Sequence, residues 1–213
     1  MYRKQMMLQR ILCIVIIVAS AIVFVYALGF MTDANDMIRD AALGYTPASN
    51  ESEAVKAEFE AKKAPMRRYL EDMNAFDSDF IRVGIGLILV SLTLIITNTH
   101  SRRKYYISNY ASSVITSASI CAAAAWAHNG IVPLKNQYYS GAIDFEFVKA
   151  ATADNAREGA VNVYTESAFW FDFHYYIFGI LLLMAALLIL NTIWKIILMK
   201  HEKNALATGR TEV

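Results

Sequence analysis

The stretch "YIFGILLLMAALLILNTIW", Tyr176 to Trp194, contains no charged side chain and consists largely of Leu, Ile, Ala and aromatic residues. A helix needs about 20 mostly apolar residues to cross a hydrocarbon core of roughly 30 Å, because every backbone N–H and C=O must be bonded within the segment. This stretch therefore predicts a membrane-spanning helix and identifies the bilayer as the solvent of the chain.

Three further stretches qualify as spans. Ile11–Phe30 is continuous and uncharged, and "FIRVGIGLILVSLTLIIT", residues 80–97, has Arg82 only at its edge. The third, which includes "ASSVITSASICAAAAWA", is long enough but weakly apolar. Since 56 % of the 213 residues are hydrophobic, we expect an all-α integral membrane protein with four transmembrane helices, at residues 11–30, 80–98, 108–128 and 172–199.

Lys and Arg are concentrated in three segments that fall on one side of a four-span chain, namely 1–10, 99–107 and 194–213. Positive residues near spans mark the cytoplasmic side, so the N and C termini are expected to be cytoplasmic, with 1–10 as the cytoplasmic N-terminus, 99–107 as a basic cytoplasmic turn and 200–213 as a cytoplasmic tail. The two outer loops are acidic: residues 31–79 have six Lys/Arg against eleven Asp/Glu, and residues 129–171 have three against five. This asymmetry gives no support to nucleic-acid binding.

The two extracytoplasmic loops are predicted to be structured, because 49 residues are too many for a bare connector. In the first loop, apolar residues at helical spacing predict two short amphipathic helices with a break at Pro65. In the second, "AIDFEFV" alternates like a strand and "VKAATADNAREGA" is typical of a short helix that ends near Gly159. The only cysteines, Cys13 and Cys121, lie in spans, which excludes a disulfide-stapled outer domain and suits a bacterial inner membrane.

The third span contains small residues where the others have Leu and Ile. Ser113, Ser117, Cys121 and Ala125 are each four apart, which predicts one helix-packing stripe. Small side chains permit close backbone approach between membrane helices. We therefore expect this span to be the central helix, shielded from lipid by the other three spans or by another subunit. A flat cofactor is the alternative occupant of such a stripe.

Four histidines lie at the ends of spans: His128 and His174 near the outer interface, His100 and His201 near the inner one. Two histidine pairs at two depths match what a di-haem carrier needs, and the outer pair with Asp172 is the candidate site for haem b or a transition metal. Asp172 and His174 are two residues apart, so they can share one metal only if the helix begins after Phe173.

An interfacial network near these residues is predicted to consist of Asp77, Asp79, Arg82, Asn129 and Glu166. In one hypothesis its carboxylates orient the metal-bound imidazoles. In the other, Arg82 pairs with Asp77, Asp79 or Asp172 within an aromatic belt, which requires no cofactor.

No Asp, Glu, Lys or Arg lies near the centre of a predicted span, although Asn191 and Lys195 lie one turn apart near the inner boundary. The sequence has no catalytic motif and no candidate catalytic residue. We therefore expect a non-catalytic accessory or structural subunit of a larger membrane complex, whose partners are the lipid bilayer and other membrane subunits or further copies of itself. One alternative is a haem- or metal-bearing electron-transfer subunit. The other is a small oligomeric channel, with a pore between copies lined by Ser113, Thr116, Ser117 and Ser119.

Overall fold

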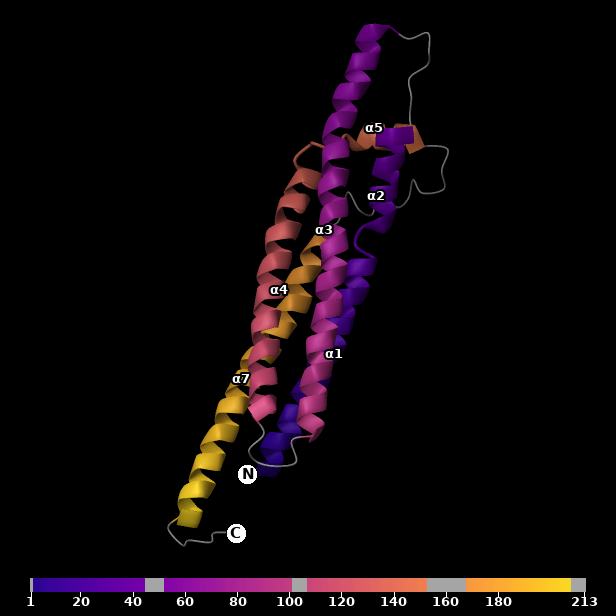
Figure 1. Cartoon of the computed structure of the whole chain (residues 1–213). Coiled ribbons are helices and arrows are strands. Elements are labelled where there is room, and N and C mark those ends of the chain that lie inside the picture. The colour runs from indigo at the N-terminus through magenta and orange to yellow at the C-terminus, as the bar shows by residue number, and fades with distance from the viewer. Residues whose placement is uncertain (1, 45–51, 101–106, 153–167, 208–213) are drawn as a thin grey trace. The chain divides into compact units, whose positions relative to one another are not determined.

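The computed structural model describes residues 2–44, 52–100, 107–152 and 168–207. Within these ranges every regular element is a helix (Figure 1). Four helices are long and apolar enough to cross a membrane, which confirms that part of the sequence prediction. They are α1 (Tyr2–Leu28), α3 (Glu53–His100), α4 (Ile107–Tyr139) and α7 (Phe169–Ala207).

Three short helices complete the described chain: α2 (Thr32–Arg39), the π-helix η1 (Asp40–Gly44) and α5 (Phe145–Thr152). Each packs against the other two. Each predicted span lies within one of the long helices, apart from the last two residues predicted for the first span, because α1 ends at Leu28.

The chain divides into two compact units. The first consists of Met1–Val25, Arg82–Trp126 and Tyr176–Val213, and the second of Tyr26–Ile81 and Ala127–Tyr175. The first unit contains the apolar parts of the four long helices. The second contains the short helices and the polar ends of the long ones.

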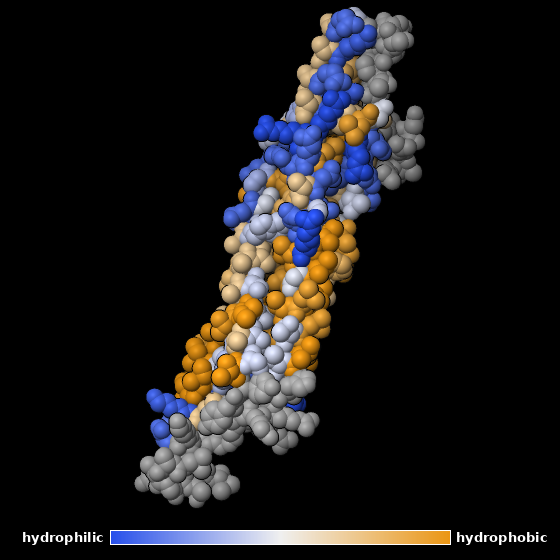
Figure 2. Space-filling model, in the orientation of Figure 1, coloured by the Kyte–Doolittle hydropathy of each residue, from blue (hydrophilic) through white to orange (hydrophobic). Residues whose placement is uncertain are grey.

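In the first unit, segments of α1, α3, α4 and α7 run side by side (Figure 1). Apolar side chains such as Ile16, Leu94 and Leu181 are completely or almost completely buried between them. Large apolar side chains also cover the outside of α1, α3 and α7, including Ile14, Leu89 and Leu183. Figure 2 shows this surface in orange. A hydrophobic exterior is expected where lipid rather than water surrounds the bundle.

The second unit has an aromatic core. The Phe30 ring makes edge contacts with Phe80 at 6.1 Å and with Phe171 at 5.7 Å between ring centroids. Tyr69 stands beside Tyr138 and donates a hydrogen bond of 3.3 Å to Asn35 Oδ1. Such edge contacts between rings each stabilise by about 0.5–1.5 kcal/mol beyond the area they bury.

Two predictions for the outer loops are wrong. Helix α3 continues without interruption through Pro65, where the sequence predicts a break. Proline removes one backbone bond, and that loss is offset by the burial of Met66, which follows it directly, and of Tyr69 and Met73, one and two turns further on. The segment "AIDFEFV" is not a strand, because α5 begins at Phe145 within it. Gly159, the expected end of a short helix, lies outside the described residues.

Candidate functional site

The exposed face of α4 in the first unit is the surface that differs most from a lipid-facing helix. Between residues 107 and 126, its exposed positions beyond the terminal Ile107 are mostly small, with Val114 and Ile115 as the large exceptions. The small ones are Ala111, Ala118, Cys121, Ala122 and Ala125. By contrast, α7 exposes Leu182, Leu183, Leu190 and Ile193 over its span. Figure 2 shows paler side chains along α4 than on the orange surface of α1 and α7.

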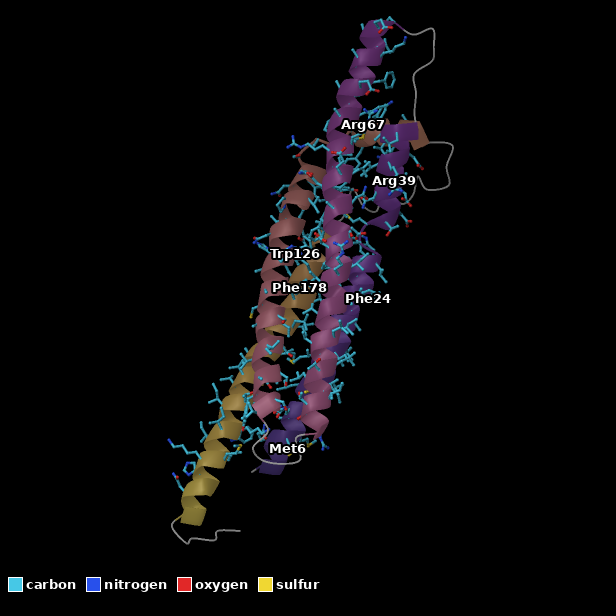
Figure 3. The ribbon with its side chains drawn as sticks, in the orientation of Figure 1. Met6, Phe24, Arg39, Arg67, Trp126 and Phe178 are labelled. Carbon is cyan, nitrogen blue, oxygen red and sulfur yellow. The ribbon has the colours of Figure 1, made fainter. Side chains whose placement is uncertain are left out.

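A groove runs beside this face, between α3 and α4. It consists of two cavities of about 370 and 350 Å³ that share Val90 in their linings. Gly86, Ser119 and Ala122 line the first, together with Trp126, which is labelled in Figure 3. The second is lined by hydroxyl and small side chains that include Thr93, Thr97, Ala111 and Ser112. The groove is apolar with scattered hydroxyl groups, as in contacts between membrane helices.

The four residues of the predicted helix-packing stripe do not share one environment. Ser113 and Ser117 are buried, and the Ser117 hydroxyl donates to the backbone oxygen of Ala185 at 3.3 Å. Cys121 and Ala125 are exposed. The first half of the stripe therefore packs within the chain, and the second half faces outward beside the groove.

The second unit brings the two outer histidines together. His174 is buried, and its Nε2 lies 3.5 Å from Nδ1 of the exposed His128. The other ring nitrogen of His174, Nδ1, bonds the backbone oxygen of Phe171. A carbonyl only accepts, so Nδ1 carries a proton, and in the neutral ring Nε2 then has a lone pair on the side of His128. The Tyr175 ring stacks on His174 at 3.9 Å between centroids.

Asp172 does not join the imidazoles. Because α7 begins at Phe169, Asp172 and His174 are both helical and point to different faces. The Asp172 carboxylate bonds Lys135 Nζ at 2.6 Å, and both side chains are about one-third exposed. Among the described residues, no group of three His, Cys, Asp or Glu side chains is placed to hold a metal ion.

The remaining members of the predicted outer network are Asp77, Asp79, Arg82, Asn129 and Glu166. Asn129 is exposed, and Glu166 lies outside the described residues. Asp79 belongs to the second unit and Arg82 to the first, and each has interactions of its own. Asp77 is half-buried with an unpaired Oδ1, and this burial raises the pKa of its carboxyl.

The inner histidines form no described pair. His201 is exposed, and the His100 side chain lies outside what the structure describes.

Sequence reasoning missed a buried polar cluster in the first unit, at the end of the bundle where α1 begins and α7 leaves it. Its members are Gln5, Gln9, Asn109, Asn191 and Lys195, all no more than 2 % exposed. Asn109 Oδ1 accepts hydrogen bonds from Gln9 at 2.9 Å and from Lys195 at 3.0 Å. The available signal was the four-residue spacing of Gln5 with Gln9 and of Asn191 with Lys195, which places each pair on one helix face.

Comparison of the chain with protein-family models, with curated proteins and with solved structures finds no match. Three places in the described structure are candidates for a function: the α3–α4 groove, the histidine pair and the buried polar cluster.

Proposed function

We propose that this protein is a non-catalytic subunit of a larger membrane complex, and that the groove between α3 and α4 receives a transmembrane helix of another membrane protein. The observation that carries the proposal is the small-residue surface of α4, at positions where α1, α3 and α7 expose Leu, Ile and Val. The basic flanks further support cytoplasmic termini, and the cysteine-free outer loops support a bacterial inner membrane.

Small residues on a helix surface gain little from lipid contact. Lipid tails are as apolar as Leu, so close packing rather than water exclusion drives membrane helices together. Ala111 and Ala125 are fourteen residues apart, which is about 21 Å of helix at 1.5 Å per residue. That length covers about two-thirds of a hydrocarbon core of roughly 30 Å. A partner helix can therefore follow the groove over most of its buried length.

The channel hypothesis receives no support from the hydroxyl groups of α4. The side chains of Ser113, Thr116 and Ser117 are buried inside one chain, not at a surface where copies would enclose a pore. Each bonds a backbone oxygen: that of Asn109, of Val90 and of Ala185, respectively. Ser119 lines the groove.

The test is Ala122→Leu, with Ala186→Leu on α7 as the matched control, because both alanines are exposed on spans and receive the same added bulk. Overpacking costs about 1–3 kcal/mol, which corresponds to a loss of roughly 5- to 150-fold in affinity. We expect mild solubilisation of the tagged protein to recover its membrane partner with wild type and Ala186→Leu, but not with Ala122→Leu.

Equal recovery with all three proteins, or a wild-type protein that is monomeric and alone, contradicts the proposal. Mass measurement of the isolated complex also tells whether the partner is a different chain or a second copy.

The histidine pair favours a second candidate, a metal-bearing electron-transfer subunit. With metal–nitrogen bonds of about 2.05 Å, a nitrogen separation of 3.5 Å corresponds to an angle of about 117° at the metal. This angle lies between tetrahedral and trigonal geometry, which suits copper with water in the remaining positions, and copper, unlike zinc, can transfer an electron. His128 and His174 would be the protein ligands.

Metal analysis and an absorption spectrum of wild type, His128→Ala and the exposed control His201→Ala test this candidate. Near-stoichiometric metal that is lost only in His128→Ala supports it. A metal-free, colourless wild-type protein eliminates it and leaves the structural role unaffected.

A further inference from the structure

The buried polar cluster in the first unit is unusual because it contains a cation without a buried anion. Lys195 is 2 % exposed, and its ammonium group bonds Asn109 Oδ1 and lies 5.2 Å from the centre of the Tyr110 ring. Among the described residues, no carboxylate lies within salt-bridge distance of it. An ammonium has three donors, so two N–H groups remain after the bond to Asn109.

The hydrogen bonds of the cluster all lead to one acceptor, Asn109 Oδ1. Gln5 Nε2 donates to Gln9 Oε1 at 3.2 Å, and Gln9 Nε2 donates to Asn109 Oδ1, which also accepts from Lys195. Two donors on one oxygen fix the orientation of the Asn109 amide, because a flipped amide would set its NH₂ group against both. Asn109 Nδ2 is consequently a donor, and it is buried without a partner.

Asn191 adds another unpaired amide. It lies one turn before Lys195 on the same face of α7, is 2 % exposed, and neither its Nδ2 nor its Oδ1 has a partner. A buried polar atom without a hydrogen bond costs about 1–3 kcal/mol. The cluster thus presents unused donors from Lys195, Asn109 and Asn191, all withdrawn from solvent and lipid.

We propose that this cluster binds a small monovalent inorganic anion of about the size of chloride. The ammonium of Lys195 supplies the opposite charge, and Asn109 Nδ2 and Asn191 Nδ2 supply neutral donors. A buried charge is tolerated when it is paired and hydrogen-bonded, and the anion satisfies both conditions for Lys195. The side chains of the cluster are no more than 2 % exposed, which selects against a lipid phosphodiester, because that group brings two acyl chains with it.

The surroundings favour an anion over a cation. In the sequence, the segments that flank this end of the bundle, 1–10, 99–107 and 194–213, contain ten Lys or Arg residues, Lys195 among them, and two Glu residues. Their summed field attracts small anions to this end of the protein. Two acceptors, Gln5 Oε1 and Asn191 Oδ1, are also buried without a partner.

The test is thermal unfolding of the purified protein in detergent, with sodium chloride replacing sodium gluconate at constant ionic strength. Gluconate is too large for a closed site and serves as the inert anion. A ligand that binds only the folded state raises the melting temperature with its concentration. For wild type we expect a rise of at least about 3 °C at a chloride concentration well above the dissociation constant.

Lys195→Met removes the charge with little change in shape and should abolish the response to chloride. Lys200→Met is the matched control on the same helix, because Lys200 is exposed, and it should keep the response. Asn191→Leu retains the lysine and should weaken the apparent chloride affinity about tenfold, which keeps the proposal testable if Lys195→Met does not fold. Broadening of the chloride-35 resonance by wild type, relieved by bromide, gives a direct measure of binding.

Identical melting in chloride and gluconate overturns the proposal and assigns the unpaired atoms to water around a neutral lysine. A full chloride response in Lys195→Met also overturns it. These outcomes are independent of partner binding, because the experiment uses the isolated chain and leaves the α3–α4 groove unaltered.

Discussion

Substitution of Gly130 by alanine should destabilise the second unit, because the added methyl group has no room. Gly130 lies within α4, and an ideal Cβ there falls within 2.5 Å of Cδ2 and Cε2 of the Phe76 ring. That ring packs at 5.2 Å from Phe80 and at 6.1 Å from Phe30, measured between centroids. Phe76 must therefore leave its position, and its contacts with two core rings weaken.

Three contributions add up to the loss of stability expected for Gly130→Ala. Overpacking costs about 1–3 kcal/mol, and each weakened ring contact adds up to about 0.5–1.5 kcal/mol. Replacing glycine by alanine inside a helix returns about 0.5–1 kcal/mol. The net loss is about 2 kcal/mol, which for a chain of 213 residues lowers the melting temperature by roughly 4–8 °C.

The assay is thermal unfolding of the purified protein at a fixed scan rate. Gly179→Ala is the matched control, since Gly179 is also helical but has no atom within 4 Å of the ideal Cβ position. It should be neutral or stabilised. In a Phe76→Leu background, Gly130→Ala should lose its effect, because the clashing ring is gone. Equal melting temperatures for Gly130→Ala and Gly179→Ala in the otherwise wild-type protein would refute the reasoning.

Two further predictions concern Asp77 and the cysteines. Burial raises the pKa of Asp77, so the folded protein holds this proton to higher pH than the unfolded chain, and stability falls as pH rises from the usual Asp range through the raised pKa. Asp77→Asn should therefore raise the melting temperature at pH 7.5 and flatten the dependence of stability on pH. An unchanged pH profile would contradict the raised pKa of Asp77. Cys121 is exposed and Cys13 is buried, so N-ethylmaleimide should label only Cys121 in the detergent-solubilised monomer, and both after unfolding in SDS. Mass spectrometry of the labelled peptides shows which cysteine has reacted. Labelling of Cys13 in the folded protein would count against the described packing of α1.

The four spans could be predicted from sequence because a bilayer imposes one strong condition, about 20 apolar residues with all backbone groups bonded internally. The outer segments were harder, because several weak signals compete there. Pro65 predicts a break by its missing N–H, yet burial of Met66, Tyr69 and Met73 keeps α3 continuous. The alternation of "AIDFEFV" is compatible with a short helix whose buried side is formed by Phe147 and Val148.

The helix-packing stripe shows a geometric limit of spacing arguments. Residues four apart on a helix of 3.6 residues per turn advance by about 40° per step, so Ser113 and Ala125 differ by about 120°. A line of four such residues therefore winds from the inside of a bundle to its outside, as it does here. Sequence identified the unusual helix, and only the structure shows which of its small residues remain available to a partner.

The polar cluster was missed for a related reason. Hydropathy identifies a span by its average, and a bundle in lipid can expose Leu and Ile while it buries Gln9, Asn109 and Lys195, because lipid gives apolar side chains no reason to turn inward. The informative residues are then the few polar ones within the spans. Their spacing of four places them on one face, and in a bilayer that face must turn toward other protein, since unpaired polar groups are costly in lipid. Asn191 and Lys195, four residues apart near the end of a span, therefore predict a buried site at this end of the bundle from the sequence alone.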